Sequence, residues 1–284
     1  MKLLFIASDP TEFRGLLAHA TAVREAGVAA RWSRLATLGA NEVLLVANGA
    51  GPDRAAAATD AGMKAFDAAA IISTGFCGAL APELGIADLV LATSIGIADR
   101  CYATSIWDGP PGSSAEQGLC DRPPCLSVGR GHALPTADRA AITNGAAITN
   151  GTAITNGPPQ AMGPRHFSGA IRSIPYVART AEEKCNLAVT GAIAVEMEAA
   201  GIAARAESFG LPLYCIRAVT DLAGETLAND FNKALRLDGH FDTMLVLKGA
   251  LRHPTVRLPE LFRLRKRCIR AAHVLGDFFA YSRI

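Results

Sequence analysis

Residues 69–80, AAIISTGFCGAL, form an apolar run that ends in two closely spaced glycines. A continuous apolar run of this length, bounded by turn residues, is typical of a β-strand that is buried on both faces of a sheet. Glycines at the carboxyl end of such a strand let the backbone turn and approach a ligand. We therefore predict a buried strand whose last residues, Gly75, Phe76, Cys77 and Gly78, border a binding site.

The same pattern recurs along the chain. Further apolar runs predict strands at 2–7, 42–51, 88–95 and 212–221. The segments between them predict helices at 11–27, closed by Gly27, at 52–66, opened by Pro52, and at 199–210. Strands that alternate with helices predict an α/β fold. We expect a single domain, residues 1–250, with a twisted mixed central sheet flanked by helices on both faces.

Composition narrows the class of protein. The 28 basic and 26 acidic residues leave a net charge of only +2, which argues against nucleic acid as a partner. The seven cysteines are scattered, and the only close pair, Cys120 and Cys125, lacks the second ligand pair of a zinc site. We expect reduced thiols, no metal and no cofactor. The apolar start is too short for a signal peptide, and no 18-residue apolar window occurs, so we expect a cytoplasmic protein.

One segment differs from the rest. Residues 108–167 are rich in Pro and Gly, and the unit AITNG occurs three times from Ala141 onward. A solenoid needs more stacked units than this to bury a core. We expect a disordered, low-complexity loop insert that interrupts the domain.

Acidic residues follow several of the predicted strands. Glu12 comes after the first, Asp221 ends the last, and AVEMEAAGIA at 194–203 places Glu196 and Glu198 around Met197. Burying an unpaired polar group costs roughly 2–7 kcal/mol, so carboxylates in apolar surroundings need partners. The alternative is that each acid has only a local structural role. Glu12 would be an exposed helix residue, Asp221 an N-cap, and Glu198 an acid in the first turn of a helix.

Three stretches together resemble a known family: STGFCGALAPELGIADLVLA at 73–92, AVEMEAAGIA and IRAVTD at 216–221. They are similar to the purine nucleoside and uridine phosphorylase superfamily, and most of all to its methylthioadenosine/S-adenosylhomocysteine nucleosidase branch. The resemblance covers residues 1–107 and 168–250. It implies an enzyme that hydrolyses the N-glycosidic bond of a purine (adenine) nucleoside with a modified 5′ position, through a ribosyl-cation-like transition state.

The resemblance also implies roles for the acids. Asp221 would protonate the leaving base at N7, and Glu12 would activate water, as paired carboxyls do in inverting glycosidases. Glu198 would accept hydrogen bonds from the ribose 2′ and 3′ hydroxyls. Met197 would lie against the sugar, and Glu196 would assist.

Further substrate-binding residues are implied in the same way. Gly49 and the stretch from Gly75 to Gly78 would present backbone amides to the ribose and base. Tyr176 would stack on the base, Val177 would offer backbone groups to its edge, and Thr220 would lie beside the acid.

Two alternatives to hydrolysis stay open. Phosphorylases of the superfamily carry an arginine where this chain has Ser73 and Thr74, which favours water over phosphate. Asp9-Pro10 followed by Arg14 nevertheless resembles the phosphorylase loop, so phosphorolysis is the second reading. A nucleoside-binding module without turnover is the third.

The C-terminal segment 251–284 is a basic, helical tail. From Arg252 onward it holds eight basic and two acidic residues. Together with residues 176–201 it resembles the hopanoid-associated branch, whose members are thought to release adenine from adenosylhopane. A basic amphipathic helix suits peripheral contact with an anionic membrane. The alternative is a helix packed on the core or on the partner of a homodimer, the assembly expected from the resemblance.

Overall fold

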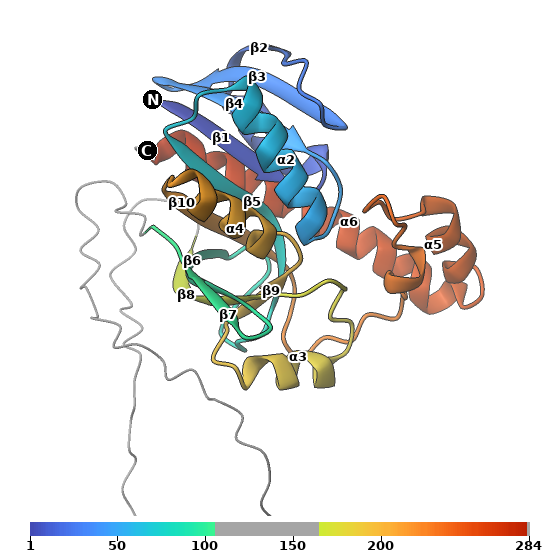
Figure 1. Cartoon of the computed structure of the whole chain (residues 1–284). Coiled ribbons are helices and arrows are strands. Elements are labelled where there is room, and N and C mark those ends of the chain that lie inside the picture. Colours follow the sequence, from blue (N-terminus) through green and yellow to red (C-terminus); the bar gives the residue numbers. More distant parts are fainter. Residues whose placement is uncertain (106–164, 283–284) are drawn as a thin grey trace, which may run out of the picture. The chain divides into compact units, whose positions relative to one another are not determined.

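A computed structural model of the chain describes residues 1–105 and 165–282, all of which belong to one compact unit (Figure 1). The α/β class, with a mixed central sheet between helices, is as expected. The AITNG repeats, Cys120 and Cys125 lie outside the described residues. The expected insert is shorter at its end, because a strand already begins at His166.

The strands form one mixed sheet in the order β10-β6-β8-β9-β5-β1-β4-β3-β2, with β7 paired to β6. Their bounds are β1 Lys2–Ala7, β2 Thr21–Glu25, β3 Trp32–Leu38, β4 Asn41–Ala47, β5 Ala70–Ala79, β6 Leu89–Ile97, β7 Arg100–Ala103, β8 His166–Ser173, β9 Ala194–Glu196 and β10 Leu213–Asp221. The helices are η1 Pro10–Phe13, α1 Arg14–His19, α2 Pro52–Ala65, α3 Ala181–Ala188, α4 Ala199–Phe209, η2 Asn232–Ala234, α5 Thr243–Ala250 and α6 Pro254–Tyr281.

Strand β5 joins two parts of this sheet. On one side it pairs in parallel with β1, which leads to β4, β3 and β2. It also pairs with both β10 and β9, and these are linked through β6 and β8. The strands β5, β10, β6, β8 and β9 therefore close into a ring. The glycines of β5 lie at the junction of the ring and the open sheet.

Helices cover both faces of the open sheet. Leu4 and Ile6 of β1 point to the core that includes α2 and α4, whereas Leu3 and Phe5 point to the core that includes α1 and α6. This alternation follows from the two-residue period of a strand. It explains why β1 is apolar at nearly every position.

The first predicted helix is wrong in its second half. It ends at His19, and Thr21–Glu25 forms an edge strand paired with β3, which the sequence reading did not include. Gly27 has a positive φ of 61° in the connection between these strands rather than at a helix end. All five residues of β2 are exposed, so no apolar periodicity distinguishes this strand from a surface helix.

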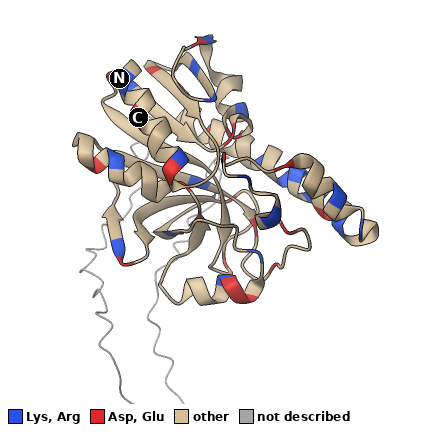
Figure 2. Ribbon diagram, turned by 45° about the vertical axis from the view of Figure 1, so that its right-hand side comes forward, with Lys and Arg blue, Asp and Glu red and all other residues tan. Residues whose placement is uncertain are grey.

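The basic C-terminal segment is integrated into the domain. The second half of α6 buries Ala271, Leu275 and Phe279 against the sheet. It crosses α1 at two glycines: a Cβ on Gly276 would lie 2.1 Å from the carbonyl carbon of Gly15. This matches the alternative in which the helix packs on the core. The first half of α6 carries exposed Lys and Arg residues, and blue segments mark Lys and Arg along this helix in Figure 2.

Candidate active site

Glu12 is buried at the first strand end. Its carboxylate accepts hydrogen bonds from the Ser8 backbone N–H at 2.9 Å and from the Ser8 hydroxyl at 3.0 Å. Asp9 caps the short helix η1, and Pro10 at its start fixes the direction of the turn. Burial raises the pKa of Glu12 to about 7, although the nearby Arg217 guanidinium opposes this shift. At neutral pH this carboxylate can therefore gain or lose a proton.

Arg217, fully buried in β10, organises the site. Its guanidinium lies 2.6 Å from the Glu196 carboxylate and 3.8 Å from that of Glu198. It also donates to the Thr74 carbonyl at 2.7 Å and to the Ser73 hydroxyl at 2.8 Å. The surrounding carboxylates raise its pKa, so it stays charged.

Glu196 and Glu198 have different partners. Glu196 accepts from the backbone N–H groups of Glu198 and Ala199, at 2.9 and 2.8 Å, where α4 begins. This is the favourable place for an acid on a helix. Glu198 accepts from the Gly51 N–H at 3.2 Å. Burial, with the charge of Glu196, raises the pKa of Glu198 to about 8. The cost of burying these two carboxylates is thus offset by one guanidinium and a helix N-terminus.

Gly75 lies directly against this cluster, where no side chain fits. A Cβ at this position would lie 2.8 Å from a Glu12 carboxylate oxygen and 2.8 Å from Arg217 Nη1. The Arg217 Nε, the Glu196 Oε1 and the Thr74 hydroxyl are buried near it without a hydrogen-bond partner in the structure. Polar groups in this position suit a water molecule or the hydroxyls of a substrate.

Asp221 ends β10 and lies against Gly78, where an added Cβ would be 2.8 Å from its carboxylate. The side chain is 14% exposed and forms an ion pair with the fully buried Lys184 of α3. Burial raises the pKa of Asp221, and Lys184 opposes this shift. Thr220 donates to the Cys77 carbonyl at 3.3 Å and lies 3.2 Å from the Asp221 carboxylate.

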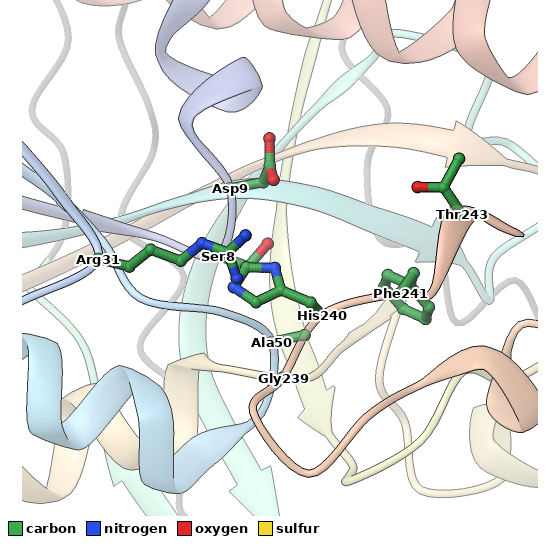
Figure 3. A pocket seen from close by; sticks show the side chains of 8 residues that line it. All are labelled: Ser8, Asp9, Arg31, Ala50, Gly239, His240, Phe241 and Thr243. Carbon is green, nitrogen blue, oxygen red and sulfur yellow. The ribbon is translucent and has the colours of Figure 1, made fainter.

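A pocket of about 350 Å³ opens beside Glu12. It is lined by Ser8, Asp9, Arg31, Ala50, Gly239, His240, Phe241 and Thr243 (Figure 3). Arg31 and His240 both line the pocket together with Ser8, the residue that holds Glu12. The His240 Nε2 is buried without a hydrogen-bond partner in the structure. The pocket is therefore polar near Glu12 and apolar near Phe241.

Two residues predicted to contact the substrate use their backbone groups for hydrogen bonds within the protein. Gly49 donates its N–H to the Ser8 carbonyl, and a Cβ there would clash with the Asp238 carbonyl at 2.7 Å. The backbone N–H and C=O of Val177 are both bonded to the Asn232 side chain, at 2.8 and 2.9 Å. The N–H of Gly49 and both backbone groups of Val177 therefore already have partners within the protein.

The remaining predicted residues divide between core and site. The Cys77 side chain is buried in the core with α2 and α4, and half-buried Phe76 packs on the opposite core. Tyr176 is 41% exposed and Met197 is partly exposed after β9. Cys77 therefore offers a binding site only its backbone, because its thiol faces the core.

Arg217 and Lys184 were absent from the predicted site. Arg217 belongs to the quoted motif, and a cation in an apolar strand is itself a signal that carboxylates lie nearby. Lys184 lies in a polar helix with no such pattern. Among the described residues, no group of three or more His, Cys, Asp or Glu could hold a metal ion, and no helix is long and apolar enough to cross a membrane.

The sequence matches the phosphorylase superfamily over residues 2–239, so the chain belongs to this superfamily. Its curated relatives include 5′-methylthioadenosine/S-adenosylhomocysteine nucleosidases of Shewanella sp. (strain W3-18-1), 23% identical, and Shewanella baltica (strain OS185), 24% identical. Each match covers 87% of this chain, and 97% and 95% of the respective relative. The chain falls in the branch that resembles these nucleosidases, as expected.

Solved structures share the fold. The methylthioadenosine/S-adenosylhomocysteine nucleosidase of S. pneumoniae, in complex with a transition-state inhibitor, has a TM-score of 0.60 at 18% identity over 99% of both chains. The futalosine hydrolase of Helicobacter pylori has a TM-score of 0.59 at 16% identity over 98% of this chain and 97% of its own. One fold thus serves enzymes named for different nucleosides.

Proposed function

We propose that this protein is a nucleosidase that hydrolyses the N-glycosidic bond of a purine nucleoside, with adenine as the expected base. The arrangement of Glu12 and Asp221 along β5 carries the proposal. Glu12 lies against Gly75 and Asp221 against Gly78. Gly75 and Gly78 lie three residues apart, a span of roughly 10 Å along the strand. The two carboxyl groups therefore lie at separate points along β5, as expected for a pair in which one group activates water and the other protonates the leaving group.

Each group has a step in this reaction. Glu12 takes a proton from water beside Gly75, and its pKa of about 7 suits a base at neutral pH. Glu198 accepts hydrogen bonds from the ribose hydroxyls, with Met197 beside the sugar. Asp221 gives a proton to N7 as the bond to C1′ breaks. The anionic cluster around Arg217 stabilises positive charge that develops on the ribose.

Phosphorolysis is less well supported. The positions where phosphorylases carry their arginine hold Ser73 and Thr74, and Ser73 accepts a hydrogen bond from Arg217. Arg14 is exposed and lines a different pocket, with Thr11, Arg265, Cys268 and Ile269. A phosphate dianion next to Glu12, Glu196 and Glu198 would also be repelled.

The test is release of free base from methylthioadenosine, S-adenosylhomocysteine, adenosine, inosine and a 5′-alkyl adenosine, with and without phosphate. Release without phosphate is expected. Release that requires phosphate would make the protein a phosphorylase. No release, with binding retained, would make it a nucleoside-binding module.

A lipid-linked substrate such as adenosylhopane is the second candidate. The pocket beside Glu12 includes Phe241 and Thr243, and α5 begins at Thr243. From this rim, α5 and the turn after it expose Met244, Leu245, Leu247 and Leu251, which we call the α5 surface. Exposed Lys248 and Arg252 flank it. Apolar side chains beside cations suit the headgroup region of an anionic membrane.

The membrane contact has its own test. Wild-type protein should sediment with phosphatidylglycerol vesicles and less with phosphatidylcholine vesicles, and Met244→Ser with Leu247→Ser should reduce sedimentation several-fold. Val189→Ser, at the exposed apolar residue that follows α3, is the matched control. Equal sedimentation of all variants would exclude this surface. A homodimer is also proposed by analogy, and sedimentation equilibrium of the full chain tests it.

A further inference from the structure

Lys184 is a fully buried lysine that has no role in the reaction steps of the proposed function. It lies in α3 and has no exposed surface, whereas its neighbours Glu182, Cys185 and Asn186 are exposed. A buried ammonium is costly unless each of its hydrogens has an acceptor. Lys184 meets this demand with the Asp221 carboxylate, the Leu222 carbonyl at 2.8 Å and the Glu225 carbonyl at 3.3 Å. The side chain is therefore directed at the proposed acid.

The other charges around this pair are already matched. The Glu225 carboxylate accepts from Arg267 at 2.6 Å and from Arg263 at 3.2 Å. It is consequently not the partner of Lys184, although its charge adds to the rise in the pKa of Asp221. Burial raises the pKa of the Cys77 and Cys268 thiols, and the charge of Asp221 adds to this shift in both. Lys184 and Asp221 thus form a pair with one cation and one carboxylate.

The ion pair with Lys184 conflicts with a role of Asp221 as a general acid that acts alone. A general acid must hold a proton when the substrate is bound. An ammonium in direct contact favours the ionised form of a carboxyl group. If Lys184 only stabilised the charge of Asp221, it would weaken the residue on which base release depends.

We propose that Lys184 holds the proton that Asp221 delivers to the leaving purine. The inference rests on the proposed function. As the bond between C1′ and N9 breaks, its electron pair goes to the purine, and N7 takes the proton from the Asp221 carboxyl group. Lys184 supplies that proton to Asp221 and becomes a neutral amine. Water attacks C1′ and gives a proton to Glu12. The proton on Glu12 returns to solvent, and Lys184 takes one back from solvent, so the cycle is balanced.

Lys184 acts through Asp221 and is a positioning residue, so its test compares leaving groups. Lys184→Arg keeps the positive charge, but a guanidinium does not release a proton. We expect about a 10²-fold fall in kcat for an adenine nucleoside, the lower end of the usual effect of general acid catalysis. 4-Nitrophenyl β-D-ribofuranoside has a leaving group that needs no protonation, so its rate should change less than threefold. Lys64→Met, at an exposed lysine of α2, is the matched control.

A second variant covers the case in which arginine does not fit. Lys184→Met leaves Asp221 as the only holder of the proton. The basic limb of kcat/KM for the adenine nucleoside should then move to lower pH. If Lys184 merely lowered the pKa of Asp221, the limb would move to higher pH, and that result would overturn the proposal.

Different results would contradict the proposed function and the role of Lys184. Wild-type protein that releases no base from any nucleoside would remove the proposed function itself. Wild-type release that is lost in Asp221→Asn but unchanged in both Lys184 variants would remove only the role of Lys184. A parallel fall in the rates for both substrates would indicate that Lys184 has a structural role, and it would also overturn the inference.

Discussion

The two ends of the proposed site differ in how their charges are balanced. At one end, Glu12, Glu196 and Glu198 surround a single guanidinium, that of Arg217. At the other, Asp221 meets one ammonium, that of Lys184. The first end has surplus negative charge, and its Glu12 and Glu198 have raised pKa values. Such a cluster can take up protons and attract a cation, whereas a matched pair can pass a single proton. The comparison suggests that water is activated at the first end and the base is protonated at the second.

The most direct way to break this comparison is to neutralise one carboxylate at each end. Glu12→Gln and Asp221→Asn should each lower kcat by about 10³-fold, since general acid and base groups contribute roughly 10²–10⁴-fold. Binding of a carbon-linked nucleoside analogue, measured by calorimetry, should change little. Wild-type rates in both variants would contradict the assigned roles. Asp67→Asn, at an exposed acid after α2, is the control.

Arg217, whose guanidinium lies among the carboxylates of the first end, should contribute to the free energy of unfolding. Arg217→Met leaves Glu196 buried without its ion-pair partner, and breaking a buried pair costs about 3–5 kcal/mol. Urea unfolding should show this loss. Arg205→Met breaks an ion pair with Asp60 whose side chains are 45% and 29% exposed, and should cost less than about 1 kcal/mol. Equal losses of unfolding free energy in the two variants would mean that burial of the Arg217–Glu196 pair does not add to stability.

A side chain at Gly75 tests whether water is activated beside this residue. Gly75→Ala places a methyl group 2.8 Å from both side chains and strains a φ of 135°. We expect kcat to fall about 10²-fold, within the range for loss of a general base. Gly224→Ala has no atom within 4 Å of the added methyl and should keep its rate. An unchanged rate in Gly75→Ala would exclude a water site beside this residue.

A change of pH is the smallest perturbation that tests the difference between the two ends of the site. Glu12 must be ionised to accept a proton, and its pKa of about 7 lies above the usual value of 4.5. Its ionised, active form is therefore half populated at about pH 7, nearly complete by about pH 8, and falls about tenfold for each pH unit below about 6. The profile of kcat should show this acidic limb, and the residual activity of Glu12→Gln should lack it. In the profile of kcat/KM the limb should be steeper, because Glu198, with a pKa of about 8, also titrates in the free enzyme.

Much of this fold follows from its apolar runs. The strands β1, β4, β5, β6 and β10 were predicted within a few residues because each contains a run of apolar residues, most of which are buried. The edge strand β2 was taken for helix, since its five exposed residues carry no periodic signal. The acids were identifiable from motifs. Lys184 was not, because its contact with Asp221 joins residues 37 positions apart that only the packing of α3 brings together.

The crossing of α1 and α6 has a consequence for how the chain folds. Gly15 packs directly on Gly276, and Phe5 of β1 meets Phe279 edge-on at 5.0 Å, so segments far apart in the sequence are direct neighbours. Until α6 docks, one face of β1, an apolar strand, stays uncovered, and such a surface favours aggregation. Refolding of the chain should therefore lose more protein to aggregation as its concentration rises.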